Sequence, residues 1–285
     1  MGYNRIRGID HLSFVNAVYT FIKFGGSVIT DKTGRESADL AVIEALAGAV
    51  AAARAADPTL AIVLGHGSGS FGHHYAARYG VHLGTPIDAD HTGFALTAAA
   101  ALRLNRIVVD ALLTAGVPAV SLQPSASLSS AHGQITHWEI GPISAALQRR
   151  LVPVIHGDVA FDTVQGTAII STEALLRFLA LHSPLRPRRI ILVGEAAVYT
   201  ADPHRDPTAQ PIPLIDRTNI AQVLHGAGAS RAADVTGGMR SKLELMWQLV
   251  ETLPDLEVRL IGPDPSLLTA ALLGQPLTNG TLIKQ

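Results

Sequence analysis

The chain has 285 residues, of which 48% are hydrophobic and only 16% charged, with a net charge of −1 and no cysteine. Such a composition is too apolar for disorder, and the length accommodates one large α/β domain or two modest lobes. The near-zero net charge gives no reason to expect nucleic acid or a membrane surface as a partner. The absence of cysteine excludes disulfides, thiolate zinc sites and cysteine nucleophiles, and it fits a cytoplasmic location.

Residues 1–19 are interpreted as an N-terminal extension. Arg5 and Arg7 precede an apolar run, as in a signal peptide, but Asp10 and His11 interrupt the pattern and no small-residue cleavage site follows. No apolar stretch reaches the ~18 to 20 residues that a membrane-spanning helix needs.

Strand and helix patterns alternate from residue 20 onward. Strands are predicted at 20–24, 60–64, 118–122, 151–155, 189–193, 257–261 and 281–283, and helices at 38–56, 92–115, 172–181, 238–253 and 265–273. A hairpin is predicted over 159–171, a proline-rich loop over 200–213, and a hinge at 183–187 because of its two prolines. Repeated βα units predict a largely parallel sheet with helices on both faces, which is an α/β fold.

The strongest local signal is a glycine-rich segment after the predicted strand at 60–64. It has four glycines within residues 65–72, and His73 follows. Glycine lets backbone N–H groups approach an anion closely, and the N-terminus of a following helix adds partial positive charge. We therefore predict a phosphate-binding loop, with a tight turn as the alternative. The G-x-G-x-x-G match within it does not predict a dinucleotide fold, because no helix and buried strand follow at the required spacing.

Two other segments combine glycines with lysines. Lys23 lies in the first predicted strand, just before a second glycine loop, and Lys242 lies one turn into the helix opened by Gly237-Gly238. A lysine within an apolar strand is costly unless its charge has a partner, and phosphate is a natural one. Exposure to solvent is the alternative for both lysines.

Several enzyme classes are excluded by missing motifs. The chain has no Walker loop, no protein-kinase signature and no serine-hydrolase elbow. Its 12 histidines do not have the spacing of metal ligands, so no metal site built from protein ligands is predicted.

Together, these segments resemble the amino-acid kinase superfamily, and within it the isopentenyl phosphate kinases. The matching segments lie in family order over residues 20–283: Lys23-x-Gly25-Gly26-Ser27, residues 66–73, Gly157-Asp158, Tyr199-Thr200-x-Asp202-Pro203 and Asp234-x-Thr236-Gly237-Gly238-Met239-x-x-Lys242. The discriminating piece is Gly69-Ser70-Phe71-Gly72-His73, since amino-acid and nucleotide kinases of the superfamily lack that histidine. Fosfomycin kinases share much of the pattern and stay an alternative, as do members that bind nucleotides or oxyanions without turnover.

The resemblance implies an open αβα sandwich, usually a homodimer, with an acceptor lobe at 20–185 and a nucleotide lobe at 186–285 in one catalytic unit. The implied reaction converts isopentenyl phosphate and MgATP into isopentenyl diphosphate and ADP, a step of isoprenoid biosynthesis by an alternative mevalonate route. The implied catalytic residues are Lys23, Lys32, His73 and Lys242. The implied acceptor contacts are Ser68, Gly69, His73 and Gly157. The implied ATP contacts are Lys23, Gly25, Gly26, Ser27, Gly69, Glu173, Tyr199, Asp202, Pro203, His204, Gly238 and Lys242, with Mg²⁺ held mainly by the ATP phosphates.

An isopentenyl tail also needs an apolar cleft beside the acceptor phosphate. Phe94 and Ala98, near the start of the helix at 92–115, are candidates for it, although Phe94 is equally well explained as a core aromatic residue. The chain departs from the family at Ser171-Thr172-Glu173, where Ser-Gly-Asp is usual. It departs again at residues 194–197, where both usual acids are missing. ATP handling is therefore expected to differ in detail.

Overall fold

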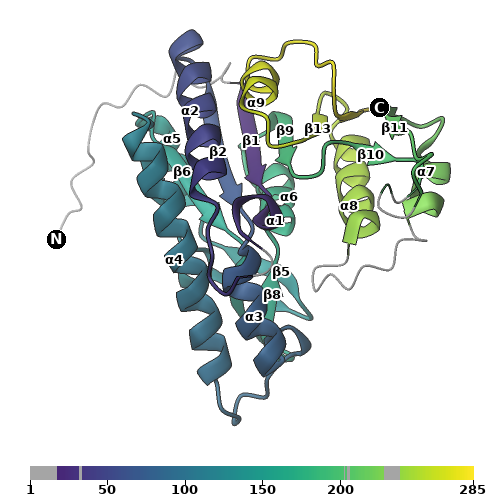
Figure 1. Ribbon diagram of the computed structural model, residues 1–285. Coiled ribbons are helices and arrows are strands. Elements are labelled where there is room, and N and C mark those ends of the chain that lie inside the picture. The colour runs from purple at the N-terminus through teal and green to yellow at the C-terminus, as the bar shows by residue number, and fades with distance from the viewer. Residues whose placement is uncertain (1–17, 32–33, 202, 204–205, 228–237) are drawn as a thin grey trace.

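The computed structural model describes residues 18–31, 34–201, 203, 206–227 and 238–285 (Figure 1). Its centre is an eight-stranded sheet in the order β12-β14-β13-β9-β1-β2-β6-β3. The strands are β1 (Tyr19–Phe24), β2 (Ala61–His66), β3 (Ala119–Ser121), β6 (Val152–His156), β9 (Pro187–Val193), β12 (Leu214–Ile215), β13 (Glu257–Ile261) and β14 (Thr281–Ile283). All neighbours pair in parallel except β13 and β14, which confirms the predicted sheet.

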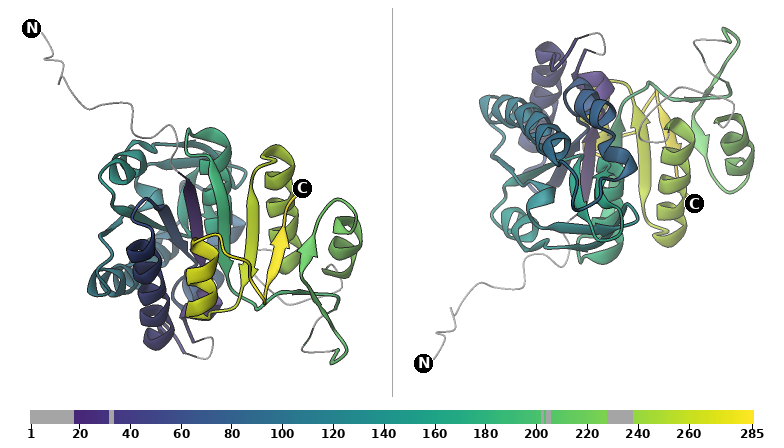
Figure 2. Two further views of the ribbon diagram at one scale, coloured as in Figure 1. Left: turned by 90° about the horizontal axis from the view of Figure 1, so that it is seen from above. Right: turned by 90° about the horizontal axis from the view of Figure 1, so that it is seen from below.

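Helices cover both faces of this sheet (Figure 2). One face packs against α2 (Leu40–Ala56), α3 (Gly69–Tyr79), α4 (Thr92–Thr114) and α9 (Pro265–Leu272). The other packs against α5 (Gly141–Gln148), α6 (Thr172–His182), α7 (Ile220–Ala227) and α8 (Gly238–Thr252). Successive residues of β1 point to opposite faces, so Ile22 joins the first core and Phe21 the second. The αβα sandwich is confirmed.

A smaller sheet lies beside the second core, in the order β5-β4-β7-β8. It consists of β4 (Leu128–Ala131), β5 (Gln134–Trp138), β7 (Asp158–Asp162) and β8 (Gly166–Ile170). The hairpin predicted over 159–171 is therefore confirmed, whereas its partner hairpin and α5 were not predicted. Buried Asp162 fastens the two hairpins, since its carboxylate accepts from Ser130 Oγ at 2.8 Å and from the N–H of Gly133 at 2.8 Å.

Three segments predicted as loops or as a hinge are partly regular or buried in the structure. β2 continues through His66 and α3 begins at Gly69, so the glycine loop shortens to two residues. The predicted loop at 200–213 is wrong at its end, because β11 (Pro211–Ile212) pairs there with β10 (Val198–Tyr199). In the hinge candidate at 183–187, Leu185 is buried and Pro187 begins β9, a position where a missing N–H is tolerated.

No helix in the described part of the chain combines the length and the hydropathy that crossing a membrane requires. The cytoplasmic location stays a prediction from the sequence.

Candidate active site

A cleft lies at the carboxyl ends of β9, β1, β2 and β6. Because these strands are parallel, their carboxyl ends lie at the same edge of the sheet. β1 lies between β2, the next of these strands along the chain, and β9, which comes much later in the sequence. Such a switch in strand order is where open α/β sheets bind ligands. The cleft is lined by Lys23, Gly25, Gly26, Ser27, Gly67, Ser68, Gly69, His73, Gly157, Ile169, Ile170, Ser171, Thr172, Glu173, Leu192, Val193, Gly194, Glu195, Met239, Lys242 and Leu260.

Backbone hydrogen bonds hold the glycine loops side by side. The N–H of Gly25 donates to Val193 at 2.8 Å, and that of Gly67 donates to Phe24 at 2.9 Å. The N–H of Gly157 continues the series by donating to the carbonyl of His66 at 2.9 Å. Each bond extends the parallel ladder by one step past the strand ends. Three loops that are far apart in the sequence are therefore aligned along one edge.

The loops approach so closely that side chains are excluded. A Cβ on Gly26 would lie 2.5 Å from the nitrogen of Gly69. Gly69 has φ +45, and a Cβ there would lie 2.2 Å from Thr30 Oγ1. Only glycine adopts this conformation and spacing without strain. The backbone N–H groups of the loops thus reach the surface of the cleft, as a phosphate site requires.

One buried hydroxyl connects the two glycine loops. Thr30 Oγ1 donates to the carbonyl of Gly26 at 2.6 Å and accepts from the N–H of Ser70 at 3.0 Å. Ser70 lies in the first turn of α3, whose cap residue Ser68 makes no side-chain capping bond. Phe71 and Gly72 donate their N–H groups to the carbonyl of Ser68, at 3.0 and 3.2 Å. Within the described part of the chain, this leaves the N–H of Gly69 as the first-turn donor of α3 for an anion at this edge.

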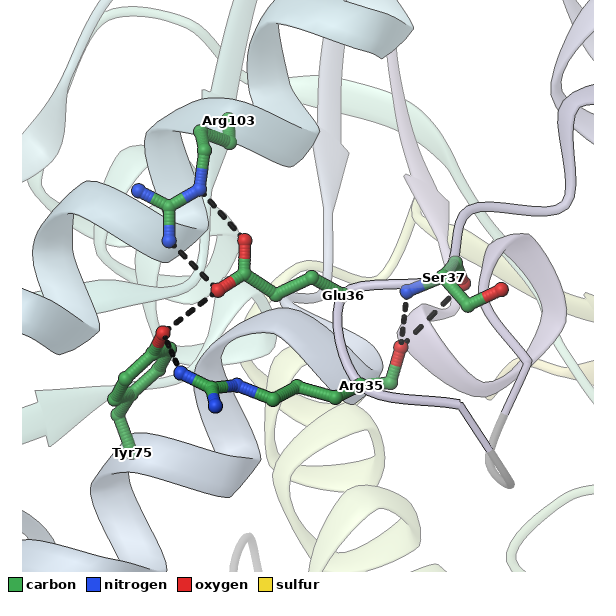
Figure 3. Close-up of polar contacts among 6 residues, drawn as sticks. Arg35, Glu36, Ser37, Tyr75 and Arg103 are labelled. Carbon is green, nitrogen blue, oxygen red and sulfur yellow. Dashed lines mark hydrogen bonds and ion pairs between the residues drawn. The ribbon is translucent and has the colours of Figure 1, made fainter.

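A charged cluster anchors α3 from its outer side (Figure 3). The carboxylate of Glu36 accepts from Arg103 Nε at 2.6 Å and from the hydroxyl of Tyr75 at 2.8 Å, and Arg35 also contacts that hydroxyl. The hydrogen bond from Arg103 holds the pKa of Glu36 below its ordinary value. The N–H of Ser37 donates to Ser70 Oγ at 3.3 Å. Residues 35–37 are thereby bound to the helix that carries His73.

Opposite charges meet on the floor of the cleft. Lys23 Nζ contacts the carboxylate of Glu173, and the two side chains are 12% and 6% exposed. Burial alone would raise the pKa of Glu173, but the charge and hydrogen bond of Lys23 and the charge of Lys242 bring it below its ordinary value. Glu173 therefore stays ionised and orients the ammonium group of Lys23. The extra methylene, relative to the usual Asp, does not prevent this contact.

Replacing Glu173 by Gln should destabilise the protein in a pH-dependent way. The variant keeps the size but leaves Lys23 buried without a counter-charge, which costs about 3 kcal/mol at neutral pH. A lowered folded-state pKa gives stability that is present above the unfolded pKa of about 4.3 and is lost as the pH falls through the folded value. Urea unfolding at several pH values should show the gap between variant and wild type shrinking below about pH 4. A gap that does not change with pH would contradict this account.

Most predicted site residues come together in this cleft. Ten line it: Lys23, Gly25, Gly26, Ser27, Ser68, Gly69, His73, Gly157, Glu173 and Lys242. Phe94, Ala98, Tyr199 and Pro203 do not line it, and Gly238 begins α8. Phe94 is half-buried against Phe161, with ring centroids 4.7 Å apart. Lys32, Asp202 and His204 lie outside the described residues, as do Asp234, Thr236 and Gly237.

Some lining residues carried no clear sequence signal. Ile169 and Ile170 come from β8, and Met239 comes from the first turn of α8. Apolar residues of this kind look like core residues until the tertiary structure places them beside the glycine loops. Thr30 could have been suspected from its position just after the second glycine loop.

The charges of the cleft suit phosphate groups. Among the described residues, no three His, Cys, Asp or Glu side chains are grouped so that they could hold a metal ion. The buried carboxylate of Glu173 is already engaged by Lys23. Two lysines and the N-terminus of α3 fit phosphate oxygens, and Mg²⁺ binds such sites through phosphates with few protein ligands.

Comparison with known proteins points to one family. The model of the amino acid kinase family matches residues 19–259. The chain is 36% identical to the isopentenyl phosphate kinase of Methanothermobacter thermautotrophicus, covering 92% of this chain and 97% of that protein. It is 34% identical to the isopentenyl phosphate kinase of Haloferax volcanii, again covering 92% and 97%. An X-ray structure of an isopentenyl phosphate kinase superposes with a TM-score of 0.77 at 33% identity, covering 93% of this chain and all of that one.

Proposed function

Because this chain belongs to the amino acid kinase family, we propose that it transfers the γ-phosphoryl group of ATP to isopentenyl phosphate, giving isopentenyl diphosphate and ADP. The observation that carries the proposal is the single cleft that joins Lys23 and Lys242 to the glycine loops and His73. The isopentenyl phosphate kinases of Methanothermobacter thermautotrophicus and Haloferax volcanii each match 92% of this chain.

The proposed phosphoryl transfer does not depend on strong general acid–base catalysis. A phosphate monoester is ionised near neutral pH and is itself the nucleophile, so the main barrier is repulsion between two anions. Lys23 and Lys242 supply positive charge beside the transferred group, and the N–H groups of Ser68 and Gly69 supply donors at the acceptor phosphate. Mg²⁺, when bound with ATP, neutralises charge on the phosphates. Lys32 stays a predicted third cation.

We assign the two substrates to different parts of the chain. Residues 20–185 hold the acceptor and residues 186–285 hold ATP, as one catalytic unit, since β9 of the second part lies between β1 and β13. In this proposal Tyr199, Pro203 and Gly238 lie along the nucleotide. We further propose that the chain forms a homodimer, as the family resemblance implies.

A coupled assay of ADP release tests the proposal. Isopentenyl phosphate, dimethylallyl phosphate and fosfomycin would each be offered as acceptor with MgATP. We expect turnover with both prenyl phosphates, because they differ only in the position of the double bond. A preference for fosfomycin would support a phosphonate kinase instead. ATP binding without turnover of any of the three acceptors would point to a binding protein.

His73→Ala should weaken use of the acceptor far more than binding of ATP. The side chain projects from α3 into the cleft, where a hydrogen bond to a charged phosphate is worth about 1.5 to 3 kcal/mol, or a ten- to hundredfold loss in kcat/KM for isopentenyl phosphate. His74→Ala is the matched control, since His74 is exposed and packs edge-on against Tyr75. Equal kinetics for the two variants would remove His73 from the acceptor site.

Phe94→Ala should shift the preference toward longer prenyl tails. An uncharged tail is selected by shape and apolar burial, and each extra buried methylene contributes ~0.8 kcal/mol where room exists. The measurement is the ratio of kcat/KM for geranyl over isopentenyl phosphate. Phe178→Ala is the control, because Phe178 packs against Trp138 away from the cleft. If the ratio changes no more than in the control, Phe94 is a core residue and does not line the pocket for the prenyl tail.

A further inference from the structure

Two buried histidines lie directly behind the glycine loops, and the proposed reaction gives neither of them a role. His66 ends β2, His156 ends the neighbouring β6, and both are 0% exposed. Their rings stack with centroids 5.6 Å apart. Burying a polar ring costs free energy unless hydrogen bonds compensate. The partners of these rings therefore indicate why histidine is present.

The partners of His66 determine which ring nitrogen carries the proton. Nδ1 lies 3.0 Å from the carbonyl oxygen of Gly67, which can only accept, so Nδ1 is the donor. Nε2 lies 3.1 Å from the amide nitrogen of Asn105, which can only donate. The hydroxyl of Ser121 donates to the amide oxygen of Asn105 and fixes its orientation. Burial, followed by the neighbouring His156, lowers the pKa of His66 to about 3, so the ring is neutral near pH 7.

This Nδ1–H bond decides where the next peptide group points. In a trans peptide the C=O and N–H bonds point in opposite directions. Since the carbonyl of Gly67 is held against the ring of His66, the N–H of Ser68 points away from that ring. Gly67 and Ser68 both line the cleft. Glycine itself imposes little preference on the orientation of this peptide group, so the ring provides the constraint.

We propose that His66 is a positioning residue of the phosphate site, which through its Nδ1–H holds the Gly67–Ser68 peptide with the Ser68 N–H directed at the acceptor phosphate. Only the identity of the anion rests on the proposed function. His66 does not touch the substrate in this arrangement; it pre-organises a donor that would otherwise reorient. Two further contacts hold His66 in place, because its carbonyl accepts from Gly157 N–H at 2.9 Å and from Thr172 Oγ1 at 2.7 Å.

His156 makes only one of the two ring contacts that His66 makes. Its Nδ1 lies 3.2 Å from the carbonyl of Gly157, but its Nε2 has no hydrogen-bond partner within the described part of the chain. Among the described residues, no side chain holds the ring of His156 as Asn105, itself bonded to Ser121, holds that of His66. The orientation of the His66 ring is therefore the more strongly constrained of the two.

Two amide substitutions separate positioning from packing. The side-chain nitrogen of Asn can occupy the place of histidine Nδ1, whereas that of the longer Gln reaches the place of Nε2. We expect His66→Asn to keep the KM for isopentenyl phosphate within about threefold of wild type, and His66→Gln to raise it about tenfold, with a smaller change in kcat. Both variants lose the ring, so similar losses in Tm are expected. Equal KM values in the two variants would overturn the proposal.

A measurement on the wild-type protein does not depend on the variants folding. The ¹⁵N NMR signals of His66 should show a protonated Nδ1 and an unprotonated Nε2, unchanged from about pH 8 to pH 5 because the folded pKa is about 3. A protonated Nε2 at neutral pH would also overturn the proposal. If wild type fails to phosphorylate isopentenyl phosphate, the proposed function fails, but pyrophosphate binding by calorimetry should still be tighter in His66→Asn than in His66→Gln. The reverse order would count against His66.

Discussion

Gly26→Ala should cost about 3 kcal/mol of unfolding free energy and lower activity a hundredfold or more. The new Cβ would lie 2.5 Å from the nitrogen and 2.8 Å from the Cα of Gly69, and 3.1 Å from the carbonyl carbon of Gly67. These are backbone atoms that cannot rotate aside, so the two phosphate loops must separate. Donors displaced by even an ångström no longer meet the transferred phosphoryl group. Urea denaturation and the ADP-release assay measure the two effects.

Gly48→Ala is the matched control for this substitution. Gly48 lies on the exposed side of α2, where a Cβ would meet nothing within 4 Å. Alanine there should stabilise the protein by roughly 0.5 to 1 kcal/mol and leave activity unchanged, since glycine disfavours the helix interior. If both variants keep full activity, the close approach of the glycine loops is not needed for catalysis.

Lys242→Ala should lower kcat by about 10² to 10³ with a smaller change in KM for ATP. Lys242 lies one turn into α8, lines the cleft and contributes to the lowered pKa of Glu173. Its charge is expected to matter most when negative charge moves between donor and acceptor. Lys242→Arg should recover only part of the rate, because a planar guanidinium cannot occupy the same point as an ammonium group.

Arg240→Ala serves as the control on the same helix. Arg240 is half exposed and pairs with Glu244 at 2.8 Å, a surface contact worth less than about 1 kcal/mol. Steady-state kinetics of Arg240→Ala should match wild type. A rise in KM for ATP alone in Lys242→Ala would make Lys242 a ground-state binder of the nucleotide.

The sequence by itself determined the class of the fold and the chemistry of its loops. Apolar runs such as 60–64 predict strands buried on both faces, because a parallel sheet covered by helices leaves no polar side. Glycines after two of these strands, with Lys23 and Lys242, predict a phosphate site from local composition alone. These features can be predicted from the sequence because each depends only on residues a few positions apart.

Only the tertiary structure decided which residues share the cleft and what supports them. Glu173 reaches Lys23 across 150 positions of sequence, and His66 at the end of β2 is held by Asn105 of α4. No local pattern reports such pairs, because the strand order that brings them together depends on long-range packing. The second hairpin, β4–β5, was missed for the same reason, since the N–H groups of its turn residues His132 and Gly133 donate to Asp162 of the hairpin beside it. Local sequence thus specifies the donors of the proposed phosphate site, whereas packing over the whole sheet sets the direction in which each donor points.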